Sequence, residues 1–242
     1  MLTAIIKKEI NTFFSSLMGY IVIAVFLIAT GLMLWVIPGQ YNIIDAGYAH
    51  VDGLFVLAPW LFLFLCPAIT MRAIAEERQN GTWDLLITRP VGVSRIVAGK
   101  FLASWLLVII ALLPTILFYI SVYYIAEPFG NVDSGAFWGS FAGLILLAGI
   151  YVAIGIFASS LSKNQVFAFI MTLSASFLLF YGFELISLFF QSGSTILLIE
   201  NLGIHAHYKS ISRGVIDSRD LTYFFFMSGL FIFFTIRKLS IK

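Results

Sequence analysis

Six long apolar stretches, separated by short polar segments, constrain this sequence more than any other feature. They cover approximately residues 17–37, 54–69, 101–126, 137–161, 166–190 and 221–236. A helix that crosses a bilayer needs about 20 mostly apolar residues, and its backbone polar groups bond within the helix. Of the 242 residues, 61% are hydrophobic and only 11% are charged, which is too little charge to cover a soluble domain of this length. We therefore expect an all-α membrane protein, with six transmembrane helices in a single domain over residues 1–242.

The N-terminal segment, residues 1–16, differs from the apolar stretches. Ile6, Ile10 and Phe13 recur at helical spacing, while Lys7 and Lys8 fall on another face. This pattern predicts a short interfacial helix lying in the headgroup plane, with a frayed basic terminus as the alternative. The apolar run that follows is too long for a signal peptide and no small-residue cleavage site comes after it, so we expect it to be retained.

Residues 191–220 form a mixed segment before the last apolar stretch. Their apolar runs are too short to cross a bilayer and are interrupted by glycine and charge, which predicts an excursion that is partly re-entrant or lies on the membrane surface. The excursion contains His205 and His207. A metal site is disfavoured there, because residues two apart do not share a helix face and no third ligand stands at a recognised spacing.

Glu184 is the one acidic residue inside a predicted spanning helix. A carboxylate within the membrane is a functional hypothesis by default. Its expected depth is close to the membrane boundary, at about 1.5 Å of rise per residue, which favours a side chain that reaches out to the interface. We assign Glu184 no role from the sequence.

The distribution of basic residues predicts the orientation of the chain. With both termini on one side, that side holds eleven of the fourteen Lys and Arg residues, and the other side holds only Lys209, Arg213 and Arg219. Basic residues are retained on the cytoplasmic side of membrane proteins. We therefore expect a multi-pass protein of the bacterial inner membrane with both termini in the cytoplasm.

The charged segment, residues 71–100, holds five of the fourteen basic residues between the second and third apolar stretches. Its end, GVSRIVAGK, resembles a phosphate-binding P-loop but has six residues instead of four before the Gly-Lys pair, and Phe101 follows where Ser or Thr is required. No signature of a hydrolase or metalloprotease is present. We expect no catalytic activity, no cofactor and no nucleic-acid partner for this chain.

Within the charged segment, the sequence predicts a short helix on the cytosolic side. Gly81 interrupts the helical pattern, Thr82 could cap the next turn, and Trp83, Leu85 and Leu86 form an apolar face. An exposed tryptophan with two leucines is typical of an anchor that docks into a partner's pocket. The alternative, equally compatible with the residues, is an interfacial helix whose Trp and Leu side chains enter the lipid.

At these residues the sequence resembles a known family. Residues 76–91, EERQNGTWDLLITRPV, and residues 96–102, IVAGKFL, are similar to the pattern after the second helix of ABC-2-type ABC transporter permeases. The N-terminal helix, the six spans and the excursion agree with that family. In detail, including residues 211–217, ISRGVID, the chain most resembles the gliding-motility (GldF-like) permease subunits.

The resemblance implies a permease subunit that couples ATP hydrolysis by a separate ATPase to the movement of a substrate in a gliding-motility-type system. ATP would bind the partner, a GldA-like ABC ATPase, and the permease would pair with a GldG-like subunit or a second copy of itself, surrounded by membrane lipids. A coupling helix between the second and third spans would contact the ATPase. Carried onto this chain, the contact residues are Glu76, Glu77, Arg78, Gly81, Thr82, Trp83, Leu85 and Leu86.

Two other functions were weighed against the sequence, and one of them stays open. A membrane scaffold that assembles envelope proteins without transport would share these features except for ATP coupling. A channel or secondary transporter would be expected to show repeated halves and charges near the bilayer midplane, and the sequence shows neither.

Overall fold

The computed structural model describes residues 2–87, 92–215 and 217–240, without the side chains of Leu85 and Ile87. All regular elements in these ranges are helical. The α-helices are α1 (Leu2–Ser15), α2 (Leu17–Trp35), α3 (Asp52–Thr70), α4 (Ala75–Gln79), α5 (Thr82–Ile87), α6 (Val93–Leu112), α7 (Ile116–Ile125), α8 (Ser134–Leu161), α9 (Gln165–Phe177), α10 (Phe183–Ser187), α11 (Gly193–Glu200), α12 (Ile204–Ile211) and α13 (Ser218–Ser240).

Six helical runs in the described residues are long and apolar enough to cross a membrane, which confirms the predicted all-α protein with six spans. They are Leu17–Trp35, Asp52–Gln79, Val93–Ile125, Ser134–Leu161, Gln165–Ser187 and Ser218–Ser240. Two contain a change of helix type. Pro114 lies in the 3-10 turn that joins α6 to α7, and a π-helical turn, η2 (Leu178–Gly182), joins α9 to α10. Proline has no backbone N–H donor, which explains the break between α6 and α7 at this 3-10 turn, Leu113–Thr115.

The boundaries around the charged segment differ from those predicted. The second run continues through α4 to Gln79, and α6 begins at Val93, whereas the sequence predicts helices of about 54–69 and 101–126. Much of the charged segment is therefore helical and not loop. The reason is that Val93, Ile96 and Val97 extend the apolar face of α6 toward its N-terminus, so the helix gains packing area by starting early.

Helix α8 is the centre of the bundle. It packs against α3, α6, α9 and α13, and more of its surface is buried than that of any other span described. Glycine permits the closest approach, since a Cβ atom on Gly155 would collide with the hydroxyl of Thr70 in α3. Elements that contact α8 are thus held at short distance from one helix.

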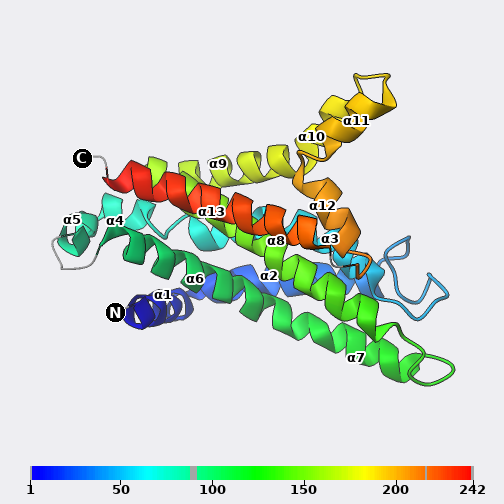
Figure 1. Ribbon diagram of the computed structural model, residues 1–242. Helices are drawn as coiled ribbons and strands as arrows, with labels where there is room; N and C mark the ends of the chain where they lie inside the picture. The colour runs from blue at the N-terminus through cyan, green and yellow to red at the C-terminus, as the bar shows by residue number, and fades with distance from the viewer. Residues whose placement is uncertain (1, 88–91, 216, 241–242) are drawn as a thin grey trace.

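The two ends of the bundle are distinct (Figure 1). Both termini and the α4 and α5 helices lie at one end, the terminal end, whereas the loop over residues 36–51, the α7–α8 connection and α12 lie at the other, the distal end. Helix α1 is seen nearly end-on in this view, so it crosses the direction of the spanning helices. Its position at a membrane surface stays a prediction.

The excursion before the last span consists of α11, which projects from the bundle in Figure 1, and α12, which returns to it. Added Cβ atoms on Gly139 and Gly143 of α8 would meet Gly214 and Ile211 respectively, the first at 2.7 Å from the carbonyl oxygen of Gly214. These two glycines, four residues apart on α8, therefore receive the end of the excursion and not another spanning helix.

Candidate functional site

The candidate site is the pair of short helices α4 and α5 at the terminal end, which contain the residues expected to contact an ATPase. Gly81 separates the two helices and has a φ of +70°, a left-handed conformation that favours glycine. This is the break predicted from the sequence. It turns the chain sharply, so that α5 does not continue the direction of α4.

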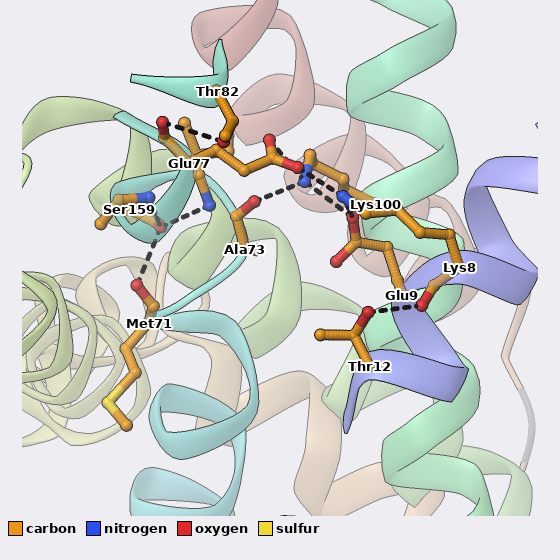
Figure 2. A network of polar contacts seen from close by, with 11 residues as sticks. Lys8, Glu9, Thr12, Met71, Ala73, Glu77, Thr82, Lys100 and Ser159 are labelled. Carbon is orange, nitrogen blue, oxygen red and sulfur yellow. Dashed lines mark hydrogen bonds and ion pairs between the residues drawn. The ribbon is translucent and has the colours of Figure 1, made fainter. Parts of the chain in front are cut away.

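A polar network, the Lys100 cluster, joins α4 to α1 and α6 (Figure 2). It consists of Lys8 and Glu9 of α1, Glu77 of α4 and Lys100 of α6. The Nζ atom of Lys100 lies 2.9 Å from Oε1 of Glu9 and 2.9 Å from Oε2 of Glu77, and it donates to the carbonyl oxygen of Ala73 at 2.6 Å. Lys8 completes the cluster at 2.7 Å from Oε1 of Glu77.

These ion pairs matter for stability because the central cation is buried. The side chain of Lys100 is only 1% exposed, and a buried ammonium group is tolerated only when it is paired and hydrogen-bonded. For Lys8, burial lowers the pKa, but the hydrogen bond to Glu77 and the charges of Glu9 and Glu77 outweigh it, so the pKa lies above its usual value. Lys8 is therefore held in the charged form, and the ion pairs of the cluster fix α4 against α1 and α6.

A second set of contacts ties the start of α4 to α8. The hydroxyl oxygen of Ser159 accepts hydrogen bonds from the backbone N–H groups of Ile74 and Ala75, each at 3.0 Å, and donates to the carbonyl oxygen of Met71 at 3.1 Å (Figure 2). Arg78 also donates from its guanidinium group to the carbonyl oxygen of Ser160. The short helix α4 is therefore connected to three other helices of the bundle, α1, α6 and α8.

The structure corrects the predicted exposure of Trp83. Its side chain is 5% exposed and packs in the hydrophobic core, where Leu86 also makes contact, so Trp83 is not an exposed anchor. Thr82 also differs from its predicted capping role, since its hydroxyl donates to the carbonyl oxygen of Glu77 at 3.3 Å. A large indole is more stable against the apolar ends of the spans than in water, and this explains the difference.

The other predicted contact residues divide by exposure. Gly81 and Thr82 are exposed, together with the neighbouring Asp84, which the sequence did not single out. Three polar members are half-buried, namely Glu76, Glu77 and Arg78. The Leu85 side chain lies outside the described residues. The structure thus leaves the Gly81 turn and the start of α5 as the exposed surface of this element.

A cavity of about 320 Å³ lies between α1 and the charged segment. Lys8, Arg72, Glu76 and Thr82 are among the residues that line it, and the Nε atom of Arg72 is buried there without a hydrogen-bond partner among the described residues. The open space adjoins one side of α4, so this helix is not packed equally on all sides.

Sequence reasoning did not find Glu9, Lys100 or Ser159 as functional candidates, and it counted Lys100 only among the five basic residues of the charged segment. A signal was available for Lys100. Ile96, Val97 and Leu107 are buried on α6, and helical periodicity places Lys100 on the same face as these three residues. No comparable signal exists for Ser159, because its partners are backbone groups more than eighty residues away.

The remaining sequence candidates lie at the distal end. Nδ1 of His205 is 2.8 Å from Oε2 of Glu184, and Nδ1 of His207 is 2.7 Å from Oδ1 of Asp220. The two histidines therefore have separate carboxylate partners. Glu184 is half-exposed in α10 and is paired with His205, which gives its carboxylate a specific neighbour.

A family model described as "ABC-2 family transporter protein" matches residues 37–236, well over half of the chain. No curated protein matches the chain. The matched range begins in the first loop and includes α3 to α12 and most of α13, so it contains the excursion and the Glu77 and Lys100 members of the cluster, but not Lys8 and Glu9 of α1.

Proposed function

The chain belongs to the ABC-2 family of transporter proteins, and from this premise we propose that α4 and α5 receive the movement of a separate ABC ATPase and pass it to the spanning helices. Membership of the family makes the chain a membrane permease component that works with an ABC ATPase subunit. In this proposal, the ATPase contacts the permease at α4 and α5, and its movement reaches the spanning helices through them.

The observation that supports this coupling role is the attachment of α4 to three helices. The Lys100 cluster links it to α1 and α6, and Ser159 links it to α8, the most deeply buried span. An ATPase can shift the permease only if it contacts two states of the permease differently. A push on α4 would be transmitted to α1, α6 and α8 together, and the cavity beside α4 provides room for displacement.

The proposed contact surface is the exposed turn and not the tryptophan. Gly81, Thr82 and Asp84 would touch the ATPase, while the buried Trp83 and the half-buried Leu86 would hold α5 on the bundle. The family resemblance also assigns contact to the neighbouring polar residues Glu76, Glu77, Arg78 and to Leu85, and these remain part of the proposed docking set. Contact through polar side chains favours a reversible joint that changes during each ATP cycle.

The direct test is to co-purify the permease with its ABC ATPase and to compare two variants. Asp84→Arg should lower association about tenfold and reduce ATPase stimulation, because a reversed charge in an interface costs about 1.4 kcal/mol or more. Its melting temperature should stay unchanged, since Asp84 is exposed. Lys163→Glu, an exposed charge reversal in the α8–α9 turn at the same end, is the matched control.

Trp83→Ala separates docking from anchoring. We expect it to lower the melting temperature as well as association, because it removes a buried indole. If Asp84→Arg binds the ATPase and stimulates it as well as the unaltered chain does, the docking surface is wrong. Association without any coupling between permease and ATPase activity would favour the membrane scaffold.

We further propose that both termini face the cytoplasm of a bacterial inner membrane, in a gliding-motility-type system with GldA-like and GldG-like partners or a second copy of the chain. The orientation is supported by the basic residues that collect at the terminal end. Nine of them are described there: Lys7, Lys8, Arg72, Arg78, Arg95, Lys100, Lys163, Arg237 and Lys238. Cys66, the only cysteine, is buried, so a cysteine introduced at exposed Asn131 or Lys163 can be labelled from either side of the membrane to test it.

A further inference from the structure

A cavity of about 460 Å³ lies at the distal end, between α3, the start of α8, η2 and α12. Cavities of this size are typical of small-molecule sites. Its apolar wall includes Phe55, Pro59 and Trp60 of α3 and Phe180 of η2. Trp60 is 38% exposed although its ring contacts Phe180, with centroids 5.8 Å apart, so part of the indole surface is free.

The π-helical turn shapes this wall. Residues Leu178–Gly182 leave the α-helical pattern, and Phe180 within them contacts Trp60 and His205. Such turns redirect a side chain and occur frequently at functional sites. Tyr208 secures the opposite wall, because its hydroxyl donates to the carbonyl oxygen of Phe55 at 2.7 Å and so fastens α12 to α3.

The rim of the cavity carries two of the three basic residues of the distal end. Lys209 and Arg213 both line it, four residues apart and both exposed, and Arg219 does not. Basic residues are rare on this side of the molecule, in agreement with the positive-inside pattern. Two of them at one cavity therefore indicate a function for that cavity. No ion pair joins either residue to an acid within the described ranges.

Acidic residues are plentiful at the distal end, but most of them are bonded to other groups. Seven of the eight acidic residues at this end have a partner that is a histidine, a hydroxyl group or a backbone N–H: Asp45, Asp52, Asp133, Glu184, Glu200, Asp217 and Asp220. Asp52 lines the cavity itself and is the one acid that opposes a bound anion there. Lys209 and Arg213 are thus the charges left available for a ligand.

We propose that this cavity binds an amphiphile with a phosphate headgroup, with its apolar part against Trp60 and Phe180 and its phosphate between Lys209 and Arg213. Arginine and lysine are the usual phosphate ligands in proteins, and an aromatic wall suits an acyl or prenyl chain. The proposal is independent of the coupling role of α4, because binding is measured without the ATPase.

The test is calorimetric titration of the full chain in a neutral maltoside detergent. The probes are dihexanoyl-phosphatidylglycerol, dihexanoyl-phosphatidylcholine and inorganic phosphate. We expect the anionic lipid to bind most tightly. If the zwitterionic lipid binds equally well, the net charge of the headgroup does not determine binding. If inorganic phosphate binds equally well, the apolar wall does not contribute. Either result overturns the proposal.

Three variants locate the site. Lys209→Gln with Arg213→Gln should weaken binding of the anionic lipid about tenfold, which is about 1.4 kcal/mol. Arg219→Gln, the matched control at the same end but outside the cavity, should change it less than about twofold. Asp52→Asn should tighten binding, because it removes the opposing charge. Equal losses in the double variant and in Arg219→Gln would show a general surface effect and would refute the site.

Discussion

The two ends of this molecule use charge in opposite ways. At the terminal end, the Lys100 cluster buries its central cation and pairs it with carboxylates from two other helices. At the distal end, Lys209 and Arg213 are exposed at a cavity while most nearby carboxylates bond to other groups. Charged side chains at the terminal end thus pair with one another and hold helices together, whereas Lys209 and Arg213 at the distal end remain available to a ligand.

The largest expected effect is at the terminal end. Lys100→Met should destabilise the protein by about 3–5 kcal/mol, because it leaves Glu9 and Glu77 facing each other without the buried cation. Thermal unfolding in detergent measures this loss. Lys163→Met removes an exposed lysine from the same end and should change stability by less than about 0.5 kcal/mol.

Hydrogen exchange sharpens this result. In Lys100→Met, α1 and α4 should exchange faster while α12 stays protected, because the cluster connects only the elements of the terminal end. Loss of protection at both ends would contradict the distinction between the terminal and distal ends, since the bundle would then respond as a single unit.

An intermediate effect is expected from Gly139→Ala at the distal end. The added methyl group would lie 2.7 Å from the carbonyl oxygen of Gly214, so it should cost about 1–3 kcal/mol and loosen α12 from α8. Gly229→Ala is the control, since nothing lies within 4 Å of its added Cβ and it should be neutral or slightly stabilising. A Gly139→Ala variant that retains full stability and full lipid binding would refute the tight seating of the excursion.

The smallest effect concerns pH. The pKa of Lys8 is raised in the folded protein, so its contribution to stability is fully present below the ordinary lysine pKa of about 10.4 and is lost as pH rises through the folded value. Lys8→Arg keeps its charge in that range, so the stability of the unaltered chain should fall relative to this variant only above about pH 10.4. A difference that appears at neutral pH would contradict this assignment.

Much of the fold could be predicted from the sequence. The apolar stretches identify the six spans because the length of a bilayer-crossing helix is set by the membrane, whatever the helices pack against. The break at Gly81 and the excursion before the last span were also predictable, since glycine and charge interrupt local patterns. What failed was exposure: Trp83 was expected at the surface and is buried.

The candidate site shows why such failures occur. Trp83 and Lys100 both lie in a segment that looks polar in sequence, yet one packs in the core and the other is the buried centre of an ion-pair cluster. Glu9 of α1 pairs with Lys100, and Trp83 packs in a core built by several helices, so both environments form only when the bundle assembles. A short stretch of sequence around Trp83 or Lys100 does not contain the residues from other helices that surround them.

The sequence alone therefore determined the class of the protein, the number of its spans and the collection of basic residues toward one side, because these depend on composition and on the thickness of the membrane. Only the tertiary structure decided which charges are paired and which are free. That division depends on distances between helices far apart in the chain: Lys100 meets Glu9 across 91 positions, while Lys209 and Arg213 face a cavity.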